Sequence, residues 1–192
     1  MIRVAFTNLK GGTGKTTVTV MVARALAEAG VSVAVQDNDK QSTASEWLRQ
    51  SGGGGVAAYA AGVKCDVLLI DTPPSEHGVI GVIGNADAYV IVSSPSPADL
   101  WASKSAIGMI REKEKKSAVK MLFNSVKKGG RLADGRAELA KAAECEHLKA
   151  YITRRECYQH AAVWGWKALD RAARDEITKV SVELMSLLAS GR

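Results

Sequence analysis

The sequence feature that most constrains the fold is a glycine-rich loop between a strand pattern and a helix pattern. Residues 2–7 are typical of a strand, residues 16–29 of a helix with one apolar face, and the loop between them contains Gly11, Gly12 and Gly14. Glycines let successive backbone N–H groups point at one anion, and the positive end of the following helix dipole strengthens the attraction. The sequence therefore predicts a strand, a phosphate-binding loop and a helix in direct succession.

The rest of the chain continues this alternation of strands and helices. Apolar runs at residues 31–36, 67–70, 88–92 and 118–123 are typical of buried strands, helix patterns cover 42–49, 98–115 and 170–189, and 147–152 is an option for a further short strand. This order predicts an α/β fold with a doubly wound, mostly parallel sheet flanked by helices. A length of 192 residues fits one domain over 1–192, and the three scattered cysteines indicate neither a disulfide framework nor a zinc site.

The loop and the strand ends supply side chains for nucleotide chemistry. Lys15 is placed to reach the β- and γ-phosphates of ATP, and the hydroxyl of Thr16 is placed to bind Mg²⁺. Carboxylates follow three predicted strands, at the edge where open α/β sheets bind ligands. The predicted ATP- or ADP-binding residues are Gly11, Gly12, Thr13, Gly14, Lys15, Thr16 and Thr17, and the carboxylates are Asp37, Asp39 and Asp71.

The loop also departs from the common phosphate-binding motif. That motif would require glycine where Leu9 stands, whereas residues 10–17 read KGGTGKTT. This variant resembles the deviant Walker A loop of the ParA/MinD family of P-loop ATPases, closest to the small ParA-type partition ATPases that lack an N-terminal DNA-binding domain. The resemblance implies a P-loop NTPase fold, and it implies that Lys10 reaches the nucleotide of a second subunit. It spans essentially the whole chain and is most specific over residues 4–41 and 67–74.

The same resemblance assigns roles to the carboxylates. Residues 67–71 look like a Walker B strand, in which Asp71 holds Mg²⁺ through a water molecule. Residues 37–41 (DNDKQ) resemble the family's Asp-x-Asp-Pro-Gln segment, with Lys40 in place of the proline. By that match Asp39 orients or activates the attacking water, and Asp37 assists the metal site.

Later segments resemble the family less specifically. Asn124 closes a strand at a position where relatives commonly contact adenine. Residues 94–100 (SPSPADL) resemble a proline-rich turn near the nucleotide or the dimer interface. Arg155 lies in a segment like the basic segment of small partition ATPases, where it is a candidate for contact with DNA or with the second subunit. Turn formation and helix capping explain these residues equally well.

Charge is concentrated in one stretch of the chain. Residues 111–131 contain eight Lys and Arg and two Glu, which gives +6, and the other 18 bases and 18 acids cancel. Such a stretch is typical either of polyanion binding or of a solvated helix face and loop. The sequence shows neither a signal-peptide pattern nor an apolar run long enough to cross a bilayer. We therefore expect a cytoplasmic, nucleoid-associated protein and no membrane binding.

These features lead to one main hypothesis and two alternatives. The main hypothesis is a Mg²⁺-dependent ATPase of DNA partition: its ATP-bound homodimer binds DNA without sequence preference, and a small ParB-like centromere-binding protein stimulates slow hydrolysis to ADP and phosphate. The first alternative is a MinD-like positioning ATPase for a protein cargo. The second is a small-molecule ligase or synthetase on the same fold, against which Lys10 argues.

Overall fold

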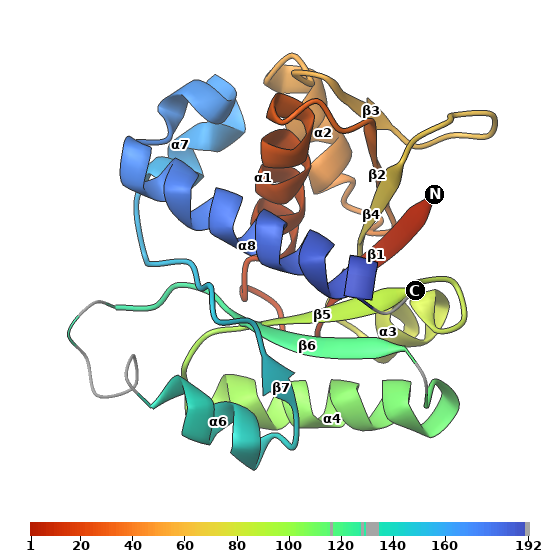
Figure 1. Ribbon diagram of the computed structural model, residues 1–192, viewed down its shortest axis with the longest axis vertical. Coiled ribbons are helices and arrows are strands. Elements are labelled where there is room, and N and C mark those ends of the chain that lie inside the picture. The colour runs from red at the N-terminus through yellow and green to blue at the C-terminus, as the bar shows by residue number, and fades with distance from the viewer. Residues whose placement is uncertain (116, 128, 130–134, 191–192) are drawn as a thin grey trace.

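The computed structural model describes residues 1–115, 117–127, 129 and 135–190, and these residues build one parallel sheet (Figure 1). The seven strands of the described part lie in the order β3-β2-β4-β1-β5-β6-β7. The strands are β1 (Ile2–Thr7), β2 (Val33–Asp37), β3 (Val56–Ala58), β4 (Val67–Asp71), β5 (Ala88–Ser93), β6 (Ala118–Phe123) and β7 (Glu146–His147). The predicted α/β fold with a doubly wound parallel sheet is confirmed.

Helices cover both faces of the sheet and create two separate cores (Figure 1). One face carries α1 (Lys15–Glu28), α2 (Thr43–Gln50), α7 (Cys157–Trp164) and α8 (Arg171–Ser190), with a 3₁₀ helix, η1 (Gly165–Ala168), after α7. The other face carries α3 (Glu76–Val82), α4 (Pro97–Lys113) and α6 (Arg136–Ala142). Because few aromatic residues are available, mainly aliphatic side chains fill both cores, which suits strands buried on two sides.

The topology places the phosphate-binding loop at a crevice in the sheet. From β1 the chain passes through α1 toward β2, whereas from β5 it passes through α4 to β6 on the other side. The strand order therefore reverses between β1 and β5, and open α/β sheets bind ligands at such a point. Asn8, directly after β1, crosses this gap: its Nδ2 donates to the carbonyl of Val92 at 2.8 Å and to Oγ of Ser103 at 3.0 Å.

Besides α6, α7 and η1, for which the sequence predicts no ranges, the structure differs from the expected elements in three places. The strand considered at 147–152 is only β7, and the chain beyond it makes an isolated bridge between Val126 and Thr153. Strand β3 follows the glycine run and has one buried side chain, Val56. Its apolar pattern is therefore too short to predict a strand from the sequence. Helix α3 contains two glycines, which disfavour helix, but Ser75 caps it and its Val79 and Val82 are buried.

Candidate functional site

The phosphate-binding loop runs from β1 into α1, and its shape depends on Gly14. This residue has a φ of 88°, and a Cβ added to it would lie 2.2 Å from Nδ2 of Asn124. Asn124, at the end of β6, is buried and donates from Nδ2 to the carbonyl of Thr13 at 2.8 Å. Asn124 thus supports the loop from the end of β6, two strands away from β1 in the sheet. Contact between Asn124 and adenine stays a prediction.

Lys15 begins α1 and lies under the loop. Its side chain is buried, and Nζ donates to the carbonyl of Lys10 at 3.0 Å. Burial lowers the pKa of Lys15, and the nearby charges of Asp71 and Asp39 act in the opposite direction. A buried lysine that donates to one backbone carbonyl and lies near two carboxylates is suited to exchange this acceptor for a phosphate oxygen.

Asp71 and Thr16 form the part of the site that fits a divalent cation. Oγ1 of Thr16 donates to Oδ2 of Asp71 at 2.7 Å. Asp71 is fully buried, and its Oδ1 has no hydrogen-bond partner among the described residues. Burial raises the pKa of Asp71 to about 6, so the carboxylate lacks compensation for its charge. A hydroxyl beside an uncompensated carboxylate matches the oxygen ligands that Mg²⁺ prefers.

Asp37 and Asp39 follow β2 and lie beside this site. Asp37 is in register with Asp71 on the adjacent strand, but its two carboxylate oxygens accept the backbone N–H groups of Asp39 at 3.1 Å and Ser45 at 2.8 Å. Asp37 therefore shapes the loop and supports the first turn of α2. Asp39 accepts the N–H of Gln41 at 3.0 Å and lies near enough to Lys15 to influence its pKa.

The carboxylates do not gather into a preformed metal cage. Within the described ranges, no group of three or more His, Cys, Asp or Glu side chains could hold a metal ion. A magnesium ion at Thr16 and Asp71 would complete its coordination with phosphate oxygens and water, as Mg²⁺ commonly does. The predicted part of Asp37 in the metal site stays a prediction.

Lys10 is paired with a residue that the sequence did not single out as functional. Its Nζ lies 2.6 Å from Oδ1 of Asp99, the third residue of α4. Asp99 also accepts a hydrogen bond from Oγ of Ser94. Burial alone would raise the pKa of Asp99, but the contacts with Lys10 and Ser94 lower it below its usual value. The proline-rich turn at residues 94–100 was the available signal for Asp99.

A cavity of about 440 Å³ extends from the loop toward the C-terminal part of the chain. At one end lie the loop and the first turn of α1, and at the other lie the segment after β7 and the start of α7. With phosphates bound at the loop as predicted, the far end would be positioned for the nucleoside of the same ligand. The lining includes Gly12, Gly14, Thr17, Asp99, Asn124, Thr153, Arg154, Arg155, Tyr158 and Gln159.

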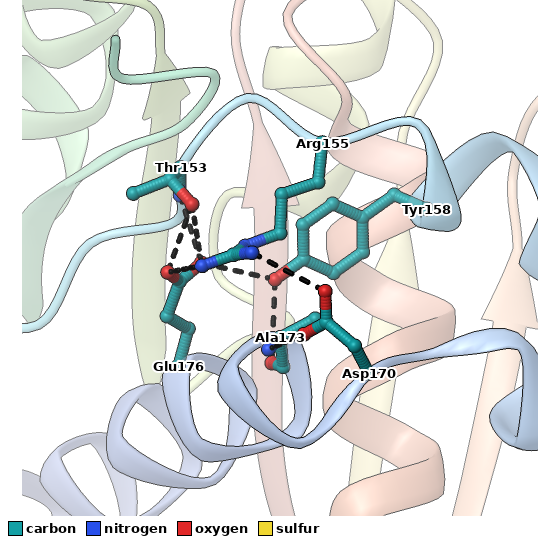
Figure 2. Close-up of polar contacts among 6 residues, drawn as sticks. All are labelled: Thr153, Arg155, Tyr158, Asp170, Ala173 and Glu176. Atoms are coloured by element: carbon teal, nitrogen blue, oxygen red, sulfur yellow. Dashed lines mark hydrogen bonds and ion pairs between the residues drawn. The ribbon is translucent and has the colours of Figure 1, made fainter. Parts of the chain in front are cut away.

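Arg155 is held within the molecule. Its Nη2 donates to Oε1 of Glu176 at 3.0 Å and its Nη1 to Oδ2 of Asp170 at 3.3 Å (Figure 2). These contacts leave 19% of the side chain exposed. Its expected contact with DNA or a second subunit would require this pairing to open.

The basic stretch is only partly available to a polyanion. Lys113, Lys115 and Lys127 are exposed, whereas Arg111 donates to the carbonyl of Glu144 and Lys120 pairs with Glu146. Lys116, Lys128 and Arg131 lie outside the described residues. Among the described helices, none has both the length and the apolar character needed to cross a bilayer.

Comparison with known proteins agrees with this geometry. Residues 4–163 match the family described as CobQ/CobB/MinD/ParA nucleotide binding domain. The chain is 27% identical over 206 residues to Maintenance of carboxysome distribution protein A of Halothiobacillus neapolitanus, which covers 94% of this chain and 95% of that protein.

Two solved structures share the fold. The MinC:MinD cell division protein complex of Aquifex aeolicus has a TM-score of 0.80 at 19% identity, covering 97% of this chain and 96% of that chain. A putative plasmid partition protein from Borrelia burgdorferi, bound to AMPPNP, has a TM-score of 0.77 at 14% identity, covering 97% and 99%. The match over residues 4–163, together with the loop, Asp71 and the topology, shows that the chain belongs to the CobQ/CobB/MinD/ParA family of nucleotide-binding domains.

Proposed function

We propose that this chain is an ATP-driven positioning ATPase that distributes a protein assembly in the cell. The observation that carries the proposal is its similarity, over 94% of its length, to a protein named for carboxysome distribution. This similarity favours a protein cargo over the DNA-partition role that the sequence first indicated. The likeness to a plasmid partition protein, at 14% identity, concerns the fold alone.

The chemistry proposed for the site is hydrolysis of ATP to ADP and phosphate. The loop amides and Lys15 hold the phosphates, while Thr16 and Asp71 hold Mg²⁺, which supplies positive charge to the phosphate oxygens. Asp39 positions the attacking water, as its place beside Lys15 and after β2 allows. Asp37 keeps the Asp39 loop in shape through its two backbone hydrogen bonds.

The switch proposed for this site is dimerisation. Lys10 lies at the mouth of the site with 43% of its side chain exposed, so it can be presented to a second copy once Asp99 releases it. ATP in both subunits would then join the two sites, and hydrolysis would separate them. A distinct partner protein on the cargo would stimulate hydrolysis, which takes the place of the ParB-like partner expected from the sequence.

The ATP-bound form is proposed to bind DNA without sequence preference. The exposed Lys113, Lys115 and Lys127 support this, because contacts with phosphate are electrostatic and independent of sequence. Binding to duplex DNA should be stronger with ATP than with ADP and should weaken as salt is raised. Equal, salt-insensitive binding in both states would remove DNA from the proposal and leave the positioning role.

The identity of the cargo can be tested in the organism whose genome encodes the protein. A labelled shell component of a carboxysome, or of a comparable assembly, should be evenly spaced in the parent strain and clustered when this gene is replaced by Lys15→Ala. A Lys64→Ala strain serves as the control, because Lys64 is exposed and distant in sequence from the loop. Even spacing in the Lys15→Ala strain, together with loss of a plasmid, would instead support DNA partition.

A further inference from the structure

The wall of the cavity opposite the loop is a segment without regular structure. Residues 152–155, together with Tyr158 and Gln159 of α7, line the nucleoside end of the cavity. Its backbone is tied to the chain after β6: the N–H of Ile152 donates to the carbonyl of Phe123 at 3.0 Å, and the isolated bridge joins Thr153 to Val126. On the side that faces α8, its position depends on side-chain contacts.

One side chain of α8, Glu176, provides most of these contacts (Figure 2). Its carboxylate accepts the backbone N–H of Thr153 at 3.0 Å and the hydroxyl of the same residue at 2.8 Å. It also accepts Nη2 of Arg155 at 3.0 Å and the hydroxyl of Tyr158 at 3.2 Å. The side chain of Glu176 is 16% exposed, so water replaces few of these bonds.

The three residues that Glu176 holds all belong to the cavity wall. Thr153, Arg155 and Tyr158 line the cavity, but Glu176 itself does not. Tyr158 is fixed a second time by its hydrogen bond to the carbonyl of Ala173 at 3.3 Å, and Arg155 by its contact with Asp170. The wall is thus attached to the first two turns of α8, with Glu176 at the centre of the attachment.

We propose that Glu176 is a positioning residue for the nucleotide, which sets affinity for the nucleoside by fixing the cavity wall formed by Thr153, Arg155 and Tyr158. The proposal rests on the nucleotide-binding function proposed above. It predicts that a defect at Glu176 acts on the nucleoside end of the ligand and leaves the phosphate end unaffected, because the loop is held independently by Asn124.

The same helix offers a matched control in Glu183. Its carboxylate also accepts two backbone N–H groups, those of Lys149 at 2.7 Å and Ala150 at 2.8 Å. These two residues lie outside the lining of the nucleotide cavity. Glu176→Gln and Glu183→Gln therefore remove the same charge from one helix, and both weaken the anchoring of backbone segments, but only the first involves the cavity wall.

The test is calorimetric titration of the full chain, in Mg²⁺, with ATP and separately with inorganic tripolyphosphate, which lacks the nucleoside. Glu176→Gln should weaken ATP binding about tenfold and leave tripolyphosphate binding unchanged, because it removes charge-assisted hydrogen bonds from the wall. Glu183→Gln should leave both affinities unchanged. Partial unfolding lowers the binding of both ligands together, so the ratio of the two affinities separates a positioning role from a general loss of structure.

Each other outcome has a distinct meaning. If Glu176→Gln keeps the wild-type ratio of ATP affinity to tripolyphosphate affinity, the positioning role is wrong while nucleotide binding stands. The same conclusion follows if Glu183→Gln changes this ratio as much as Glu176→Gln does. Glu176→Asp, which keeps the charge on a shorter side chain, should also lower the ratio and serves if the glutamine variant fails to fold. If the wild-type chain binds tripolyphosphate but gains nothing from the nucleoside, the proposed function fails as well.

Discussion

At the scale of single residues, the site is defined by buried charged side chains, and few ligands other than a nucleotide would satisfy them. Asp71 is buried with one oxygen unmatched among the described residues, and its pKa is raised to about 6. Lys15 is buried against a backbone carbonyl. Buried groups of this kind are costly to stability unless a ligand satisfies them, and they concentrate at functional sites. The pair therefore indicates a site for a ligand that carries both anionic oxygen and a cation.

The role proposed for Asp39 separates ATP binding from ATP hydrolysis. Asp39→Ala should leave the affinity for ATP close to that of the parent and reduce turnover roughly a hundredfold or more, since it removes the group that positions water. The loop itself should persist, because Asp37 still supports it through the N–H groups of residue 39 and Ser45. Calorimetry with ATP and a phosphate-release assay measure the two effects. Hydrolysis at the parental rate would reassign the role of Asp39.

Local spacing predicted some of these residues and missed others. Thr16 and Lys15 follow from the loop motif, and Asp71 from the end of an apolar strand, because each pattern is contained in a few consecutive residues. Asp99 and Glu176 act through partners that only the tertiary fold brings near, so no spacing in the sequence identifies them. The basic segment indicates Arg155, but no local pattern predicts its partners Asp170 and Glu176.

At the scale of elements, apolar strands and long helices were predictable and the short elements were not. The predicted strand at 118–123 coincides with β6, and the predicted strand at 67–70 with β4 to within one residue. The run at 67–70 is fully buried and entirely apolar, and the run at 118–123 has Lys120 as its one polar residue. Strand β3 and helix α3 are stabilised by packing against neighbours that the sequence does not reveal. For the same reason the wall at residues 152–155 has no signature of its own.

Helix α8 should give the protein an acid-sensitive contact. Burial alone would raise the pKa of Glu176, but hydrogen bonds from Arg155 and Thr153 outweigh it, and the pKa lies below its usual value. A carboxyl group with a lowered pKa stabilises the fold above its unfolded-state pKa, and this contribution is lost as pH falls through the folded-state pKa. At pH 7 the free energy of unfolding of the parent protein should therefore exceed that of the Glu176→Gln variant. The difference between the two should shrink below about pH 4.5. Urea denaturation across this range tests it, and a pH-independent difference would contradict it.

At the scale of the whole molecule, a proposed dimerisation switch depends on freeing Lys10. In this structure Asp99 holds the lysine in its own subunit at 2.6 Å, while the lysine is still 43% exposed. A partly exposed ion pair contributes about 1 kcal/mol or less, so the restraint is weak enough for ATP binding to overcome. In the proposed switch, the contact would raise the concentration at which two subunits join without preventing dimerisation.

Asp99→Asn should favour the dimer. With saturating ATP, sedimentation should show dimers at a protein concentration about two- to fivefold lower than for the parent. The reason is that Lys10 no longer has to break an ion pair before it contacts the second subunit. With ADP both proteins should remain monomeric. Lys104→Ala is a suitable comparison, since it breaks a different ion pair of α4, with Glu144, away from the loop. A higher dimerisation concentration for Asp99→Asn would show that Asp99 acts across the interface instead.

The sheet separates two cores, and the loop has attachments on both sides of it. The loop continues directly into α1 in one layer, while Lys10 is paired with Asp99 of α4 in the other. One chemical event at the crevice therefore has mechanical connections to opposite surfaces of the molecule. A positioning ATPase must bind its cargo and a cellular surface at the same time, and it must release one of them when ATP is hydrolysed. In the proposed role, the two binding surfaces could therefore lie on opposite faces of the sheet, and one hydrolysis event would affect both.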